Sequence, residues 1–176
     1  MVLYRRMLVP GGSYFFTLTL RNRRLTWLTS HVDLLRASFR EVRAARPFQI
    51  DAIVVLPDHL HAVWTLPDGD ADYANRWRLI KGGFTQRLKA RGITLEADHR
   101  GEHGVWGRRF WEHWIRDERD RRQHVDYIHY NPVKHGYVSA PGEWAHSSFR
   151  RYVRQGLLPP DWGASGLQLP RGVGRE

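Results

Sequence analysis

Two histidines in the stretch LPDHLHAVWTL, residues 56–66, are the side chains best suited to bind a metal ion. His59 and His61 lie two positions apart. Side chains alternate between the two faces of a β-strand, so both imidazoles would point the same way, about 7 Å apart. Such a pair on a rigid strand can hold one divalent ion. The same pattern also fits two polar residues on a hydrated face, so the interpretation needs support from the rest of the chain.

A second candidate group lies in HVDYIHYNPVKHGY, residues 124–137. In a helix, Tyr127 and Asn131 are i, i+4 neighbours, and His124 lies on the same side. An amide oxygen beside two imidazoles would complete a three-ligand site for magnesium or manganese, with positions open for phosphate oxygens. Tyr127 could then attack a phosphorus atom whose charge the metal offsets. Such assistance matters, because a phenol with the ordinary pKa of about 10 is a poor nucleophile at neutral pH.

Attack by tyrosine has a consequence that attack by water lacks. The phosphodiester is kept as a phosphotyrosine, so the broken strand can be rejoined elsewhere without ATP. The residues therefore favour transfer or rejoining of DNA strands over hydrolysis.

The elements that must position these residues can be predicted from hydrophobic periodicity and turn residues. The predicted strands are 14–20, 48–56, 59–66 and 107–116. Three helices are predicted. The first begins at a Ser30 N-cap and ends before Pro47, and the second covers residues 70–91. The third runs from about Asp117 to Asn131, where Pro132 should end it. Pro57-Asp58 should join the second and third strands as an antiparallel hairpin. Residues 92–105 are expected to form a loop.

This order predicts a ferredoxin-like split βαβ fold, an α+β architecture whose two helices cover one face of an antiparallel sheet. The alternate residues from Leu60 to Leu66 should pack beneath those helices, whereas His59 and His61 should lie exposed on the open face. We expect a catalytic domain of residues 1–138. A tail of residues 139–176 should follow, with one short helix near SSFRRYVRQG and a mobile Gly/Pro-rich end.

The charge of the chain points to a nucleic-acid partner. Its 28 Lys and Arg residues and 18 Asp and Glu residues give a formal net charge of +10. All but three of the basic residues are arginine, whose planar guanidinium pairs well with phosphate. A soluble protein with an arginine-rich composition is the alternative. The absence of cysteine excludes disulfides, thiolate zinc sites and cysteine nucleophiles. We find no signal peptide and no membrane-spanning apolar run, so we expect a cytoplasmic, nucleoid-associated protein.

Clusters of basic residues are the candidate DNA contacts. One cluster begins at Arg76 in the helix predicted over 70–91, where a solvated helix face is the alternative interpretation. Gly82 and Gly83 inside that helix indicate a kink or a close approach of DNA. The predicted DNA-binding residues are Arg5, Arg6, Arg21, Arg23, Arg24, Arg76, Arg78, Lys81, Arg87, Lys89, Arg150 and Arg151.

Two residues beside the predicted nucleophile have alternative interpretations. Tyr130 is a rival nucleophile, but its position about 60° around the helix from Tyr127 favours packing or stacking on DNA. His124 could orient Tyr127 or the metal, and solvent exposure is the simpler expectation.

The remaining histidines are assigned no catalytic role. His129 and His135 are expected to pack or to face water. His99 and His103 do not indicate a second metal site, because no further ligands accompany them.

The motifs together resemble a known family. HLH on a hairpin strand, followed by YIHYNP on a helix, resembles the HUH endonucleases and, within them, the single-tyrosine transposases associated with repetitive extragenic palindromes (REPs). The further blocks GGSYFFTLTL, VVLPDHLHAVWTLP, VWGRRFWEHWIRDE, YIHYNPVKHGYV and EWAHSSFRRYV stand in family order. The resemblance covers roughly residues 10–155.

The resemblance implies that His59, His61 and Asn131 bind a divalent metal ion, magnesium or manganese, and that Tyr127 is the nucleophile. It also implies a ferredoxin-like fold. The implied substrates are single-stranded DNA and REP-like hairpins next to a tetranucleotide guide. Cleavage should leave a 5′-phosphotyrosine and a free 3′-hydroxyl. The REP-associated branch is expected to be monomeric, whereas the insertion-sequence relatives act as dimers that exchange helices, so a dimer stays an alternative.

Two other functions fit parts of the sequence. A protein that only coats hairpin DNA would need the basic surface but not an intact tyrosine, histidine pair and asparagine. A ferredoxin-like RNA-processing enzyme that uses a histidine would need neither tyrosine nor metal.

Overall fold

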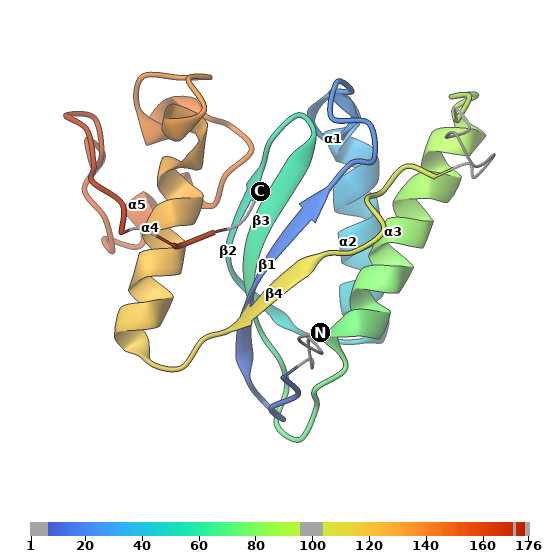
Figure 1. Cartoon of the computed structure of the whole chain (residues 1–176), viewed down its shortest axis with the longest axis horizontal. Helices are drawn as coiled ribbons and strands as arrows, with labels where there is room; N and C mark the ends of the chain where they lie inside the picture. Colours follow the sequence, from blue (N-terminus) through green and yellow to red (C-terminus); the bar gives the residue numbers. More distant parts are fainter. Residues whose placement is uncertain (1–6, 96–103, 171, 175–176) are drawn as a thin grey trace, which may run out of the picture.

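The computed structural model of the chain describes residues 7–95, 104–170 and 172–174. A four-stranded antiparallel sheet, in the order β2-β3-β1-β4, forms its centre (Figure 1). The strands are β1 (Ser13–Thr19), β2 (Gln49–Val55), β3 (His59–Thr65) and β4 (Trp111–Trp114). The helices are α1 (Trp27–Ser30), α2 (Val32–Ala45), α3 (Tyr73–Ala90), α4 (Glu118–Lys134), the 3-10 turn η1 (Pro141–Glu143) and α5 (Phe149–Arg154).

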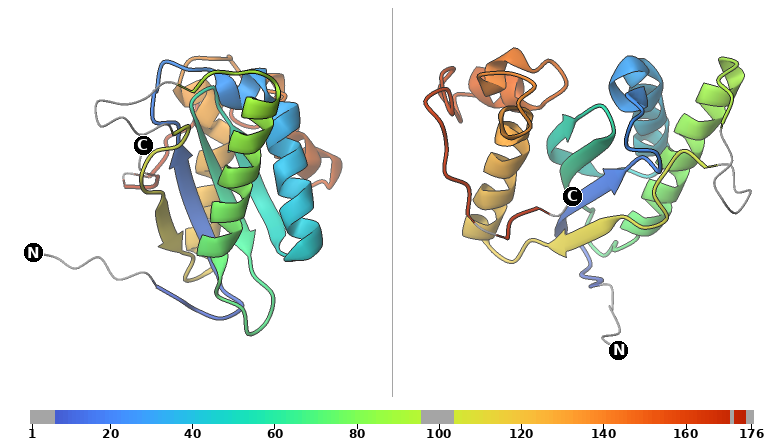
Figure 2. Two further views of the ribbon diagram at one scale, coloured as in Figure 1. Left: turned by 90° about the vertical axis from the view of Figure 1, so that its right-hand side faces the viewer. Right: turned by 45° about the horizontal axis from the view of Figure 1, so that its top comes forward.

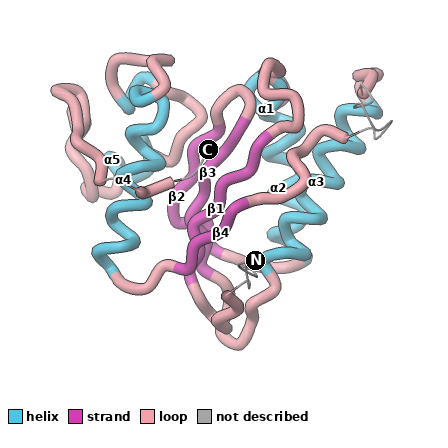
Figure 3. Tube along the Cα trace, viewed as in Figure 1, coloured by secondary structure: helices cyan, strands magenta, loops and turns pink. Residues whose placement is uncertain are grey.

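The strand order and the element order confirm the predicted ferredoxin-like arrangement. Helices α2 and α3 cover one face of the sheet, and α4 lies over the other (Figures 1 and 2). The expectation of an open second face is therefore wrong. The chain returns across the sheet after β4 and buries that face beneath α4 and the loops of the tail (Figure 3).

The first hydrophobic core lies between the sheet and helices α2 and α3, as the alternation along β3 predicts. Trp64 of β3 is fully buried and stacks on Trp77 of α3, with ring centroids 4.0 Å apart. The two helices pack closely at Gly83, where a Cβ atom would lie 3.3 Å from the Ser38 hydroxyl oxygen. Close helix packing therefore accounts for Gly83, whereas the space around Gly82 is open.

The second core lies between the sheet and α4. Phe15 and Val63 of the sheet pack in one cluster with Val125 and Ile128 of α4. Two polar contacts fasten the start of α4 to opposite edges of the sheet. Arg121 donates to the buried carboxylate of Asp51, at the β-bulge of β2, over 2.8 Å. At β4, the His113 Nε2 atom lies 2.9 Å from a carboxylate oxygen of Asp120.

Three element ends differ from the prediction. Ser30 ends α1 instead of capping α2, because its hydroxyl donates to the Thr26 carbonyl. Pro132 lies inside α4, which continues to Lys134. Pro132 has no N–H to donate, but the His135 amide still donates to the Asn131 carbonyl, so the helix continues past the proline. Strand β4 is four residues long and shorter than the predicted 107–116. Within the described ranges, no helix has the length and apolar character needed to cross a membrane.

Arg76 has a structural role instead of the predicted contact with DNA. Its side chain is 3% exposed and donates to both carboxylate oxygens of Asp70. It also donates to the Arg46, Pro47 and Asp72 carbonyls, so it joins the end of α2 to the start of α3. Hydrogen bonds from Arg76 hold the pKa of Asp70 below its ordinary value. This burial removes Arg76 from the candidate DNA contacts.

Replacing Arg76 with alanine should lower the free energy of unfolding by about 3 kcal/mol, because three carbonyl groups and a carboxylate lose a charged donor. The matched variant Arg78→Ala removes an exposed arginine whose side chain donates to the Asn75 side chain, and should change stability by less than about 0.5 kcal/mol. Urea unfolding of both variants measures the difference. Equal stability of the two variants would contradict the structural role.

Candidate active site

His59 and His61 point to the same face of the sheet, as their spacing predicts, and their ring centroids lie 5.2 Å apart. The predicted exposure is wrong, because the two side chains are only 1% and 0% exposed. The covering elements are α4 and the loop that follows it. The pair is therefore buried between sheet and helix, where electrostatic interactions are stronger than in water.

Both imidazoles are oriented by a neighbour at Nδ1. For His61 the neighbour is the Thr17 hydroxyl oxygen, 2.8 Å away, and for His59 it is a carboxylate oxygen of Asp58, also at 2.8 Å. Asp58 also accepts from Arg23. Burial alone would raise the pKa of Asp58, but the hydrogen bonds from His59 and Arg23 hold it below its ordinary value. Contacts at Nδ1 leave Nε2 as the ligand atom, as in metal sites whose histidines are fixed by a carboxylate or hydroxyl.

Helix α4, which covers this face of the sheet, carries Tyr127 and Asn131. Tyr127 is 2% exposed, and its ring centroid lies 5.1 Å from that of His61. Asn131, one turn later, is fully buried. Phe15 of β1 fills the space beside these groups and contacts the rings of both His61 and Tyr127.

Two residues that contact these groups were not predicted as site residues from the sequence. Lys134 donates from Nζ to the Tyr127 hydroxyl oxygen over 3.2 Å, and its ammonium also lies 5.0 Å from the ring centroid. His135 contacts His59, with ring centroids 5.0 Å apart. Helical spacing contained the signal, because Lys134 is i+7 from Tyr127 and His135 is i+4 from Asn131. The predicted helix end at Asn131 hid both relationships.

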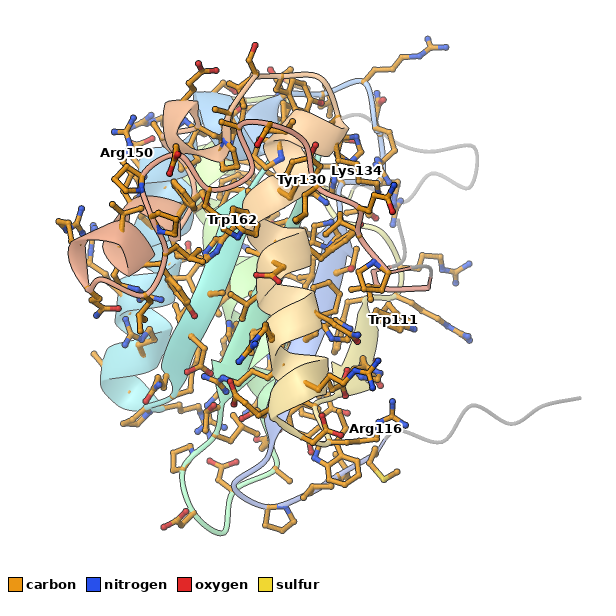
Figure 4. The ribbon with its side chains drawn as sticks, turned by 90° about the vertical axis from the view of Figure 1, so that its left-hand side faces the viewer. Trp111, Arg116, Tyr130, Lys134, Arg150 and Trp162 are labelled. Atoms are coloured by element: carbon orange, nitrogen blue, oxygen red, sulfur yellow. The ribbon has the colours of Figure 1, made fainter. Side chains whose placement is uncertain are left out.

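The rival tyrosine, Tyr130, lies on a different side of α4. It packs against Trp162 of the tail, with ring centroids 6.5 Å apart (Figure 4). This packing is one of the two roles expected from its position around the helix, and it keeps the phenol away from the His59 and His61 side.

Comparison with known proteins places the chain in a family. A REP-associated tyrosine transposase of Escherichia coli is 48% identical to the chain over 159 residues, which are 90% of this chain and 89% of that protein. The chain belongs to the REP-associated tyrosine transposases. A Haemophilus influenzae protein with the same family name is 43% identical over 164 residues, 92% of this chain and 93% of that one. No protein-family model matches the chain.

A solved structure supports the same assignment. It is described as a REP-associated tyrosine transposase bound to a REP hairpin. It matches with a TM-score of 0.82 and 44% sequence identity, and the match covers 99% of this chain and 100% of that one. The chain is thus a tyrosine transposase with the fold of that relative.

In this transposase the end of the tail lies against the predicted nucleophile. Leu169 and Val173 pack on the second core, and a Cβ atom added at Gly174 would collide with the Tyr127 phenol. The φ angle of 74° at Gly174 also favours glycine. The end of the tail therefore covers the Tyr127 phenol.

Removal of residues 169–176 should raise the rate of DNA cleavage roughly tenfold. Docking of two apolar side chains contributes on the order of 1.4 kcal/mol, which corresponds to about a tenfold excess of the covered state over the uncovered state. The substitution Gly174→Ala should act in the same direction, because the added methyl group collides with Tyr127. Single-turnover cleavage rates measure both effects. Unchanged rates would show that the tail does not limit access.

The predicted solvent exposure of His124 is wrong, because its side chain is 4% exposed. Its Nδ1 atom lies 2.9 Å from the Asp120 carbonyl oxygen, and its ring stacks on His113 at 4.6 Å. Burial lowers the pKa of His124, which favours the neutral ring. The side-chain ligand atoms of His113, Asp120 and His124 lie within 4.8 Å of one another. Their hydrogen bonds give them a structural role, which is to fasten α4 to β4.

The other predicted DNA contacts differ in their surroundings. Arg24, Arg78, Lys89 and Arg150 are exposed. Four others contact groups within the chain. Arg23 and Arg87 form ion pairs with Asp58 and Glu41, respectively. Lys81 contacts the Gly107 carbonyl and the Trp106 ring, and Arg151 donates to the Ile50 and Asp51 carbonyls. Arg21 lies beside Gly104. Arg5 and Arg6, like His99 and His103, lie outside the described residues.

Proposed function

We propose that this transposase cleaves single-stranded DNA beside a REP-type hairpin, with Tyr127 as the nucleophile and a divalent metal ion at His59, His61 and Asn131. The observation that carries the proposal is the position of Tyr127, whose ring centroid lies 5.1 Å from that of His61 and whose hydroxyl oxygen accepts a hydrogen bond from Lys134 over 3.2 Å. The hairpin substrate is proposed because the similar solved structure is described as bound to a REP hairpin.

The residues present fit a divalent metal ion. Two imidazoles fixed at Nδ1 and a buried carboxamide on the facing helix form a nitrogen and oxygen donor set. Magnesium prefers oxygen ligands, so imidazole donors favour manganese over magnesium. His135, against His59, offers a further imidazole. A metal ion bound there would polarise a phosphoryl oxygen of the substrate.

The residues of the chain account for the covalent step. The Lys134 ammonium beside the phenol oxygen stabilises the negative charge that forms as the hydroxyl loses its proton. The Tyr127 oxygen then forms a bond to phosphorus, and the bond from phosphorus to the 3′-oxygen breaks. The leaving 3′-oxygen takes up a proton, and the 5′-phosphate stays on tyrosine. Attack by another 3′-hydroxyl on this phosphotyrosine reverses the step and joins a new strand.

We further propose that the active unit is one chain. Helix α4 packs on the sheet of its own chain, and all the groups named above come from that chain. Exchange of helices with a second copy is not needed to complete the site.

Incubation of the native chain with manganese and a REP-type DNA hairpin that carries single-stranded flanks tests the proposal. We expect a protein–DNA species that survives denaturing gel electrophoresis and is absent with EDTA. Formation of the same species with an RNA hairpin, or free cleaved DNA without any adduct, would contradict the assignment.

Replacing Lys134 with methionine should slow adduct formation roughly tenfold at neutral pH, because the phenolate loses a neighbouring positive charge worth about 1–2 kcal/mol. Lys134→Arg should restore most of the rate. The slow rate of Lys134→Met should recover as the pH rises toward the ordinary pKa range of a phenol. A pH-independent defect, or no defect, would argue against this role.

A further inference from the structure

A groove without an assigned role lies at the β2 edge of the sheet, between α2 and the segment before α5, which is hydrogen-bonded to the edge of the strand. The groove encloses a cavity of about 330 Å³. Its floor is apolar and includes Phe39, Ile50 and Ile53. Arginines of α2 line one wall, and residues 145–148 line the other. A concave apolar floor with a charged wall is suited to a ligand that has both apolar and anionic parts.

The charged wall is a stripe of arginines on α2. Arg36, Arg40 and Arg43 follow one another at i, i+4 and i+7, so they share one side of the helix. All three are exposed, and within the described ranges none forms an ion pair with a carboxylate. The helical rise spaces them by about 6 and 4.5 Å. By contrast, the acidic residues Asp33 and Glu41 of α2 pair with Arg91, just after α3, and with Arg87 of α3.

A path of ring contacts connects this groove to the histidine pair. From His59 the path passes through His135, Tyr137 and Trp144 to His146, with successive centroid distances of 5.0, 6.1, 5.4 and 5.9 Å. Tyr137 is 44% exposed, and His146 lines the groove.

Hydrogen bonds to the end of β2 fix this path in place. The Val55 amide donates to the His146 carbonyl, and the Trp144 indole donates to the Val55 carbonyl. The rings are thus held against the end of the sheet that carries His59.

We propose that this ring path and the arginine groove hold the single-stranded DNA that flanks the cleavage site. The inference rests on the proposed function and extends it to the route of the substrate strand. Unpaired bases stack on aromatic side chains while arginines neutralise the backbone, which is the usual way that proteins hold single strands. A duplex buries its base faces and would leave the rings and the apolar floor without contacts.

The test measures DNA binding in a Tyr127→Phe background, so that the probe stays uncut. The probes are a DNA stem-loop with an oligothymidine tail of about a dozen nucleotides and the same stem-loop without a tail. The variant Arg36→Gln/Arg40→Gln is compared with Arg119→Gln/Arg122→Gln, a pair of exposed arginines near the start of α4 with the same change in charge.

The groove variant should bind the tailed probe roughly tenfold more weakly than the parent, and its log–log salt slope should fall by about 1.4, which is 0.7 for each lost phosphate contact. Its affinity for the tailless probe should not change, nor should the affinity of the control variant for the tailed probe. Tyr137→Ala should lower the affinity for the tailed probe and leave the affinity for the tailless probe unchanged.

An equal loss for both probes would show that the groove holds the stem, and no loss for either would show that it holds no DNA. Each result would overturn the proposal. Neither result touches the proposed function, because adduct formation by the native chain is measured separately.

Discussion

Replacing Tyr127 with phenylalanine should reduce the covalent protein–DNA species by at least about a thousandfold, below detection on a denaturing gel. The variant lacks the oxygen that bonds to phosphorus, and within the described ranges the neighbouring phenol, Tyr130, packs against Trp162 on another side of α4. Hairpin binding should persist, because the ring and its contacts with Phe15 and His61 are kept. The fold should lose only about 1 kcal/mol with the hydrogen bond from Lys134.

The matched control is Tyr130→Phe, which removes the same atom one turn away. We expect it to form adduct at the parental rate. An adduct that persists in Tyr127→Phe and disappears in Tyr130→Phe would transfer the role to Tyr130 and contradict the mechanism.

Replacing His61 with alanine should slow manganese-dependent cleavage roughly a thousandfold, because polarisation of a phosphoryl oxygen contributes several kcal/mol to the transition state. Hairpin affinity should change little, since His61 is fully buried beneath α4. Manganese titrations followed by cleavage rate and by calorimetry should both show weakened binding of the metal.

The control for His61→Ala is His129→Ala, which removes another fully buried histidine of the α4 layer. His129 lies 2.9 Å from the Ser148 hydroxyl oxygen, and burial lowers its pKa to about 3, so it stays neutral at physiological pH. This variant should lose stability but keep its manganese dependence. Equal loss of cleavage in both variants would indicate a general folding defect and leave no support for a metal site at His61.

The strands and the placement of the histidine pair could be predicted from the sequence because they depend on local rules. Alternation along β3 places Leu60 and Trp64 on one face and His59 and His61 on the other, in any fold that keeps the hairpin. The burial of the pair could not be predicted in this way. It depends on α4 crossing the second face, which is a long-range contact that the periodicity of β3 does not contain.

The roles of the charged residues also depend on long-range contacts that the sequence pattern does not contain. Arg76 and Arg78 look alike in the sequence, but the partners of Arg76 come from the end of α2 and from the turn before α3, so only the three-dimensional fold shows that it is buried. Lys134 was missed for a local reason. Proline was expected to end the helix, and the last turn that places the ammonium beside Tyr127 was therefore not considered.

The most direct measurement is mass spectrometry of the trapped adduct after digestion with protease and nuclease. The account predicts that the nucleotide remnant is attached through a 5′-phosphate to the peptide that contains Tyr127, and that the remnant is missing when EDTA is present during the reaction. Attachment to any other residue, or attachment through a 3′-phosphate, would contradict the account.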